Sequence, residues 1–271
     1  MKFAIFSTCV GDAMFPAAPE ATTKLLERLG HEVVFPKGQA CCGQMHVNSG
    51  YLEDALPIVR NHVKTFSPVL DGEWDAIVVP SGSCTGAIQH EQAMVARHFG
   101  ETALANRAEI IGEHTWDLPV LLTDFLGVTD VGAYFPYRTT YHPSCHSMRV
   151  AKIGDRPIHL LERVEGIDLV PLPDAKVCCG FGGTFSLKYP DISTAMVTEK
   201  AGNVEKTGAE VLVADDYTCL MNIWGRMAKM GLDTKIAHIS EVLASTKDDP
   251  WVHTVGAPLE GAQTVGVSRD F

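Results

Sequence analysis

The sequence lacks any run of about 18 apolar residues, the length of a membrane-spanning helix, so no transmembrane segment is expected. It is short of basic residues: 22 Lys and Arg against 33 Asp and Glu give a net charge of −11. That balance argues against a nucleic-acid partner, which would need basic patches. No flavin or nicotinamide fingerprint and no Ser-His-Asp or paired-carboxylate constellation is present. The chemistry of this chain must therefore come from other residues.

What the sequence has instead is one cysteine pattern that occurs twice. Cys41-Cys42-Gly43 recurs as Cys178-Cys179-Gly180, an offset of 137 residues. The remaining cysteines match as well, at offsets of 136 and 135, and none is left over. Four thiolates per half is the ligand count of an iron–sulfur cluster. The predicted cluster and metal ligands are Cys9, Cys41, Cys42, Cys84, Cys145, Cys178, Cys179 and Cys219.

Short β-prone runs alternate with helical stretches in both halves, as in α/β proteins with parallel sheets. Each cysteine site follows a predicted strand, and ligands of parallel sheets gather beyond the carboxyl ends of strands. We therefore expect an α/β fold of two pseudo-repeated halves, each with a mainly parallel sheet flanked by helices and a cysteine cluster at the strand ends. Strands are expected at residues 2–7, 31–35, 74–79, 138–141, 168–170 and 210–214, and helices at 20–29, 50–66 and 240–245. The expected boundaries are 1–130 for the first repeat, 131–246 for the second and 247–271 for a surface-hugging or mobile C-terminal tail.

The apolar start of the chain resembles a short signal peptide, but residues 139–145 repeat it internally. We therefore expect it to belong to the folded repeat rather than to an export signal. The absence of such a signal favours a reducing compartment, where clustered cysteines more often bind metal or carry out redox chemistry than form disulfides.

Three plainer interpretations of the cysteines fit the pattern less well. Buried core cysteines would have no reason to cluster at strand ends. A disulfide between adjacent cysteines is strained and labile. Zinc usually takes paired C-x₂₋₄-C knuckles, which neither half provides twice, although the ligand count alone permits it. An iron–sulfur cluster has several metal corners, so adjacent thiolates can reach different irons.

Other residues give weaker signals. His142 and His146 flank Cys145, either as ligands of a mixed site or, as we favour, as supporting or capping side chains. His46 has no counterpart in the second half and is interpreted as structural. Asp215 and Asp216 precede Cys219 as turn residues by default, or as oxygen ligands to an open iron site. Residues 182–184 lack the lysine and the spacing of a phosphate-binding loop.

Taken together, the doubled motifs resemble the cysteine-rich CCG domain family. The resemblance covers about residues 2–245 and rests on the cysteine motifs and on Asn48-Ser49-Gly50-Tyr51, Tyr141-His142-Pro143-Ser144-Cys145 and His238-Ile239-Ser240-Glu241. Relatives include the cysteine-rich component of heterodisulfide reductase and the iron–sulfur components of glycolate oxidase and of anaerobic glycerol-3-phosphate dehydrogenase. The chain is most similar to the lactate utilization protein A branch of the family.

One departure from the wider family concerns the number of ligands. The family pattern closes each set with C-x-x-C, but the first cysteine of that pair is Ser81 in one half and Asp216 in the other. In relatives that resemble the heterodisulfide reductase component, five cysteines hold a non-cubane [4Fe–4S] cluster. Four cysteines fit an ordinary cubane better, although an oxygen of Ser81 or Asp216 would complete an unusual cluster.

The resemblance implies a cytoplasmic subunit of an oxidoreductase complex that oxidises L-lactate to pyruvate. Its implied cofactor is a [4Fe–4S] cluster, one or two per chain, and its implied partners are proteins similar to lactate utilization proteins B and C. Catalytic residues are not assigned. Two other classes stay open: a metal-binding scaffold with structural zinc, and a thiol–disulfide reductase of the heterodisulfide reductase B type.

Overall fold

The computed structural model describes residues 1–253, and the part of the predicted tail from 254 to 271 lies outside the described residues. The chain forms two four-stranded parallel sheets, with the strand orders β2-β1-β3-β4 and β6-β5-β7-β8. This arrangement confirms the predicted α/β fold of two repeated halves. The first sheet contains β1 (Lys2–Ile5), β2 (Glu32–Val34), β3 (Ala76–Val79) and β4 (Thr115–Asp117), and the second contains β5 (Arg138–His142), β6 (Asp168–Val170), β7 (Val211–Ala214) and β8 (Lys235–His238).

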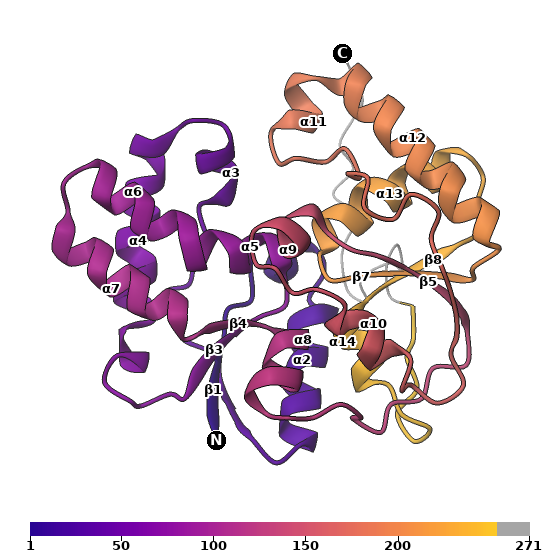
Figure 1. Ribbon diagram of the computed structural model, residues 1–271, viewed down its shortest axis with the longest axis horizontal. Helices are drawn as coiled ribbons and strands as arrows, with labels where there is room; N and C mark the ends of the chain where they lie inside the picture. The colour runs from indigo at the N-terminus through magenta and orange to yellow at the C-terminus, as the bar shows by residue number, and fades with distance from the viewer. Residues whose placement is uncertain (254–271) are drawn as a thin grey trace, which may run out of the picture.

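Helices connect the strands in both halves (Figure 1). Those of the first half are α1 (Cys9–Met14), α2 (Ala17–Arg28), α3 (Gln44–Asn48), α4 (Leu52–Thr65), α5 (Gly82–Gly86), α6 (Gln92–His98), α7 (Thr102–Glu113) and α8 (Leu118–Val120), with a 3₁₀ turn η1 (Ser67–Val69) and π-helical turns η2 (Ala87–Glu91) and η3 (Leu121–Phe125). Those of the second half are α9 (Cys145–Arg149), α10 (Arg156–Leu161), α11 (Phe185–Lys188), α12 (Pro190–Thr207), α13 (Tyr217–Lys229) and α14 (Ile239–Ala244). No helix within residues 1–253 is both long and apolar enough to cross a membrane.

The strand pairing repeats with the same offsets as the cysteines. Phe3 lies opposite Ala76 in the first sheet, and Thr139 lies opposite Val211 in the second. The central strands β3 and β7 are buried along their whole length, which explains their unbroken apolar sequences. The edge strands β4 and β8 were not predicted from the sequence, because both are short and carry polar residues at their ends.

Alternation along the strands divides the apolar side chains between an outer and a central layer. In the first half, Ala4 and Phe6 face the outer helices α4, α6 and α7, and in the second half Leu212 and Ala214 face α12 and α13. Phe3 and Val213 face the opposite way, into one cluster that both halves build. Helices α2, α8, α10 and α14 lie together between the sheets and complete this central layer (Figure 1).

Polar contacts also join the two halves through this layer. The Arg28 guanidinium at the end of α2 donates to the carbonyl oxygens of Val131, Leu243 and Ala244. The halves therefore share a core and are not two separately packed bodies. The boundaries at residues 130 and 246 stay a prediction.

Candidate metal centre

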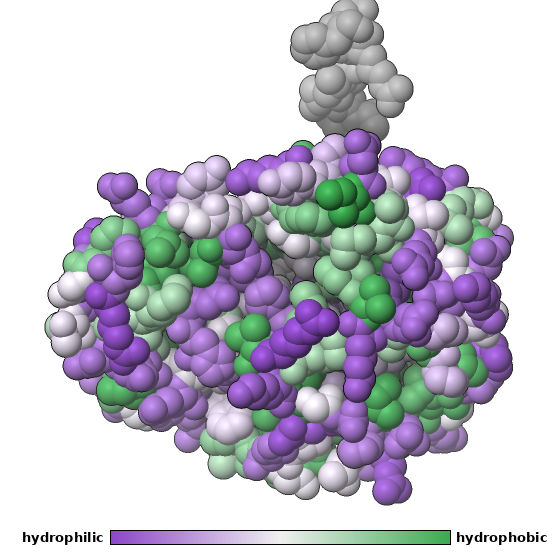
Figure 2. All heavy atoms as spheres, turned by 45° about the horizontal axis from the view of Figure 1, so that its top comes forward, coloured by the Kyte–Doolittle hydropathy of each residue, from purple (hydrophilic) through white to green (hydrophobic). Residues whose placement is uncertain are grey.

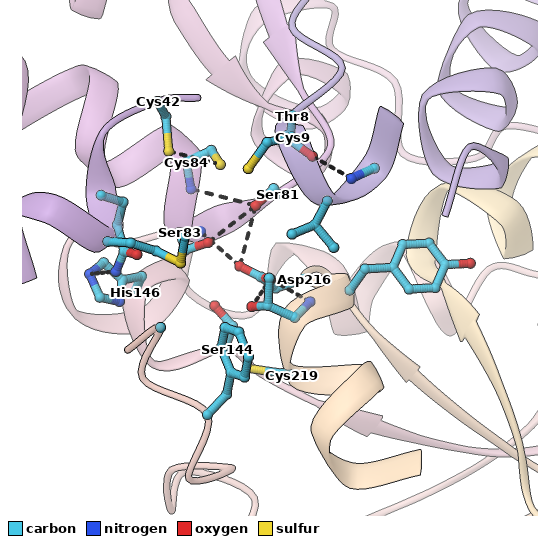
Figure 3. A pocket seen from close by; sticks show the side chains of 18 of the residues that line it. Thr8, Cys9, Cys42, Ser81, Ser83, Cys84, Ser144, His146, Asp216 and Cys219 are labelled. Atoms are coloured by element: carbon cyan, nitrogen blue, oxygen red, sulfur yellow. Dashed lines mark hydrogen bonds between the residues drawn. The ribbon is translucent and has the colours of Figure 1, made fainter. Parts of the chain in front are cut away.

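The two sheets bring all eight cysteines to the wall of one cavity. Figure 3 labels four of them, Cys9, Cys42, Cys84 and Cys219. Cys9 begins α1 directly after β1, and Cys145 begins α9 directly after β5. Cys84 and Cys219 lie in the first turns of α5 and α13, which follow β3 and β7. Because these strands are parallel, their carboxyl ends meet at the edges of the sheets that face the cavity.

Within each half the sulfur atoms lie close together. The Cys9 and Cys41 sulfurs are 3.9 Å apart, and the Cys42 and Cys84 sulfurs are 3.1 Å apart. In the second half, 3.0 Å separates the sulfurs of Cys179 and Cys219. Two thiolates on one tetrahedral metal ion lie about 3.8 Å apart, since each metal–sulfur bond is about 2.3 Å long. The first spacing thus suits two ligands of one metal ion. An iron–sulfur cluster binds each thiolate at a different iron, so the sulfurs of all three pairs would have to move farther apart to hold one.

The backbone conformation explains why each CCG motif ends in glycine. Gly43 and Gly180 have φ angles of +91° and +82°, which disfavour any residue with a Cβ. A Cβ on Gly180 would also lie 2.9 Å from the Ser193 carbonyl oxygen. This backbone turn directs the Gly43 amide at the Cys41 sulfur at 3.4 Å and the Gly180 amide at the Cys178 sulfur at 3.3 Å. Amide donors of this kind stabilise a thiolate and adjust the properties of bound metal.

Hydrogen bonds among the thiols favour one anion in each set. Bonds from Cys42, Cys9 and the Gly43 amide lower the pKa of Cys41, and bonds from Cys145, Cys179 and the Gly180 amide lower the pKa of Cys178. The buried thiols of Cys42 and Cys179 have raised pKa values, because they donate to neighbouring sulfurs and are removed from water. The first cysteine of each CCG motif is therefore the position in its set where the thiolate, the form that binds metal, is most favoured.

Ser81 and Asp216, which replace the family's additional cysteines, contact each other across the two halves (Figure 3). Asp216 is 1% exposed, and its carboxyl group accepts from the amides of Ser83 and Thr218 at 3.0 Å each and from the Ser81 hydroxyl at 3.3 Å. It thereby caps the N-terminus of α13 and holds the first turn of α5. Both of its oxygens are engaged in the protein, so Asp216 acts as a clamp between the halves, in keeping with its default interpretation as a turn residue.

Asp215, the residue before Asp216, is also buried. Its carboxyl group accepts hydrogen bonds from the Ser144 amide, at 3.1 Å, and from the Ser147 hydroxyl. Burial raises its pKa from 3.8 to about 6, against the lowering effect of hydrogen bonds from Ser147 and Ser144. Across the interface, burial and the charges of Asp215 and Asp216 raise the pKa of Asp117 at the end of β4.

The raised pKa of Asp215 predicts a pH-dependent stability difference. A carboxyl group whose pKa is higher in the folded than in the unfolded state contributes its full stabilisation of the fold below about pH 4. This contribution is lost as the pH rises through 6. Asp215→Asn keeps the acceptor for Ser144 but cannot ionise. Relative to the wild type, it should therefore gain about 3 kcal/mol between pH 4 and pH 7.5. Urea unfolding of metal-free protein across this range measures the difference; Asp233→Asn, at an exposed position, is the matched control. A constant difference between Asp215→Asn and wild type would contradict the prediction.

The histidines flanking Cys145 occupy different environments. His146 lies 3.2 Å from the Gln44 amide nitrogen and 4.0 Å from Glu91, which links it to the first half. His142 is 1% exposed, and neither of its ring nitrogens has a hydrogen-bond partner within residues 1–253. Its ligand atoms and the sulfurs of Cys179 and Cys219 all lie within 4.8 Å of one another. His142 thus directly adjoins the second sulfur set, and the structure allows either of its two predicted roles.

Sequence reasoning missed several side chains around the cysteines. The Gln92 amide donates to the Cys42 carbonyl at 3.1 Å, and the Asn222 amide donates to the Cys179 carbonyl at 2.8 Å. Both bind the carbonyl of the second cysteine of the CCG motif, although Gln92 begins α6 and Asn222 lies on α13, in the turn after Cys219. The only signal available was the repeat itself, since both are helical amides at comparable distances after the CCG motif.

Residues 182–184, the last of the weak signals in the sequence, lie where the two halves contact each other. The Thr184 hydroxyl hydrogen bonds to that of Ser49 at 2.5 Å, and Lys188 hydrogen bonds to the Tyr51 hydroxyl at 3.2 Å. Here α11 of the second half approaches the loop before α4 of the first. The outer surface of this part of the molecule carries apolar side chains in small groups among polar ones (Figure 2).

Comparison with known proteins matches the sequence of this chain to one family. The cysteine-rich (CCG) domain matches twice, at residues 3–89 and 139–224, and these two regions contain all eight cysteines. Proteins described as lactate utilization protein A align with almost the whole chain. The protein of Oceanobacillus iheyensis is 44% identical over 248 residues, which cover 92% of this chain and 98% of that protein.

The chain belongs to the lactate utilization protein A family. Two more members support this: that of an Exiguobacterium species is 45% identical over 240 residues, covering 89% of this chain and 96% of its own. That of a Geobacillus species is 41% identical over 245 residues, covering 90% of this chain and all of its own. The predicted resemblance is confirmed, and membership of the lactate utilization protein A family supports a role in lactate utilization.

Proposed function

We propose that this chain is an iron–sulfur redox subunit of a system that oxidises L-lactate to pyruvate in the reducing cytoplasm. The observation that carries the proposal is the convergence of eight cysteines on one cavity, four from each half. Thiolates are the usual ligands of iron–sulfur clusters, and four per cluster is the usual number. When bound, such clusters would supply one-electron transfer. The chain would then be one subunit of an oxidoreductase complex with partners similar to lactate utilization proteins B and C.

The kind and number of donor residues match a four-cysteine [4Fe–4S] cluster in each half. The sets are Cys9, Cys41, Cys42 and Cys84 in the first half, and Cys145, Cys178, Cys179 and Cys219 in the second. In each set two thiols are buried and two are reachable from the cavity or solvent, and the CCG glycine contributes an amide donor. Ser81 and Asp216 are engaged with each other and with backbone amides, which supports a cubane rather than a five-ligand cluster.

Metal analysis tests this proposal and the predicted alternatives together. Protein purified or reconstituted without oxygen should contain about eight irons and eight sulfides, and should show an EPR signal after reduction with dithionite. About four irons and four sulfides would mean that only one of the two sites holds a cluster. A colourless protein with stoichiometric zinc would overturn the redox proposal in favour of a scaffold; the group formed by His142, Cys179 and Cys219 is the place to look for that zinc. A metal-free protein with a reversible dithiol would instead select the thiol–disulfide reductase.

A further inference from the structure

The two cysteine sets differ in how far they are open to the outside of the molecule. Cys9 is exposed, whereas Cys145, its counterpart in the second half, is half-buried. A surface hollow of about 310 Å³ also reaches the first set, with Cys9, Cys41 and the 58% exposed Phe35 in its wall. The first set thus lies between two openings, this outer hollow and the central cavity that both halves share.

The equivalent hollow of the second half does not reach the cysteines. It lies beyond β5 and β6, as the outer hollow of the first half lies beyond β1 and β2. In its wall Pro143 takes the place of Ser7. Leu172 takes the place of Pro36 in the same way. This second hollow is larger, at about 630 Å³, but none of the described residues that line it is a cysteine.

The anchoring of the turn before Cys178 explains why this thiol is covered. Lys200 of α12 is 1% exposed, and its ammonium group donates to the carbonyls of Asp174 and Ala175 at 2.6 and 3.2 Å. These bonds tie the turn to α12. Ala175 and Lys176 of the turn line the second hollow, so the turn borders it in place of Cys178.

The corresponding loop of the first half leaves its cysteine uncovered. Side chains of α4 bond only to the Gly38 carbonyl there. Gln39 turns inward and hydrogen bonds to the backbone at the end of β1. Ala40, directly before Cys41, is exposed and carries only a methyl group. Cys41 therefore stays in the wall of the outer hollow.

The surface around the outer hollow suits contact with another protein. Asp12 in the wall and Lys37 in the loop are of opposite charge, so the contact would depend mainly on the apolar Phe35 and Ala40. Complexes that transfer electrons bury little surface, so a face of this size is sufficient. The net charge of −11 would attract a basic partner from a distance.

We propose that electrons pass between this chain and a basic redox protein at the first cysteine set, through the face formed by Cys9, Phe35 and Ala40. The second set exchanges electrons with that protein by way of the first. In each step one electron leaves the reduced cluster of the first set and reduces the one-electron centre of the partner, with no bond made or broken. This inference rests on the proposed function and adds to it the point of contact with the partner.

Labelling of metal-free, reduced protein tests the geometry without iron. A maleimide joined to a bulky polymer should modify the first set about tenfold faster than the second, because its thiols are more accessible. The same hydrogen bonds favour a thiolate in both sets, so a difference in rate reports access. Ala40→Trp should slow labelling of the first set. Val177→Trp, the same change directly before Cys178, is the matched control and should not. Equal rates for the two sets would overturn the inference.

Electron transfer from anaerobically reconstituted, reduced protein tests the point of contact. The probe is ferricytochrome c, a basic haem protein. Cys178→Ser, which keeps the first cluster, should reduce it about tenfold faster than Cys41→Ser, which keeps the second. With both clusters present, Ala40→Trp should slow the reaction and Val177→Trp should not. Ferricyanide needs no contact face, so it should show a smaller difference between the two cysteine variants.

The outcomes separate this inference from the proposed function. Equal rates of cytochrome c reduction by the two cysteine variants, or an equally large difference with ferricyanide, would overturn the inference while the proposed function stands. Protein that binds no iron would remove the proposed function itself, which the iron count decides before any rate is measured. If either cysteine variant loses all of its iron, the comparison of Ala40→Trp with Val177→Trp decides the outcome.

Discussion

Replacing Cys178 by serine should remove about half of the bound iron and leave the other half in place. Cys178 is the thiol whose pKa is lowered by bonds from Cys145, Cys179 and the Gly180 amide, so it supplies the thiolate of the second set. A serine hydroxyl is a much poorer ligand for iron than a soft thiolate. The first set, with Cys41 in the equivalent role, keeps its own four sulfurs. About four of eight irons should therefore remain.

The reciprocal variant, Cys41→Ser, is the matched control. Both variants should keep similar amounts of iron but different EPR signals, since each retains the other site. Iron, sulfide and EPR measurements on anaerobic protein give the comparison directly. Full iron in both variants would show that neither cysteine is a ligand. Complete loss of iron in either one would show that the two sets hold a single shared group in their common cavity.

Removal of the Asp216 carboxyl group should destabilise the protein by about 3 kcal/mol. Asp216→Ala leaves the amides of Ser83 and Thr218 and the Ser81 hydroxyl without their acceptor in a buried place. Buried donors without partners each cost about 1–3 kcal/mol, and the loss of a helix cap costs about 1 kcal/mol. Because the contacts cross from one half to the other, this loss falls on the interface between the repeats.

Ser81→Ala is the control for this variant. It removes one hydroxyl and the weak cap of α5 but leaves the Asp216 contacts to Ser83 and Thr218, so it should cost about 1 kcal/mol. Urea unfolding of metal-free protein measures both variants without interference from bound iron. A cost for Asp216→Ala no larger than that for Ser81→Ala would mean that the clamp contributes little to the fold.

Much of the arrangement could be predicted because the information was local and repeated. The strands β1, β3 and β7 are short, mainly apolar runs, β5 is a short run of β-prone residues, and each of the four ends a few residues before a cysteine. A parallel sheet turns that linear pattern into convergence at one edge. The strands β4 and β8 are paired only on one side and carry polar residues at their ends, so the sequence gives them no comparable periodicity.

Contacts between the halves could not be predicted, because they depend on packing between segments remote in sequence. The bond between Ser81 and Asp216 joins residues 135 positions apart. Lys200 lies on a helix with many polar residues, where a lysine is ordinarily expected in solvent. Only the turn before Cys178, folded over the end of its side chain, makes it a buried cation.

The shared central layer limits what evolution can do with the duplication. Phe3 and Leu25 from one repeat and Tyr141 and Leu160 from the other belong to the same apolar cluster. A repeat produced alone would expose its side of that cluster to water. A loss of cysteines in one half would therefore abolish a site but could not be followed by deletion of that half. A repeat that no longer held a metal site would still be retained, because it covers the apolar surface of the other repeat.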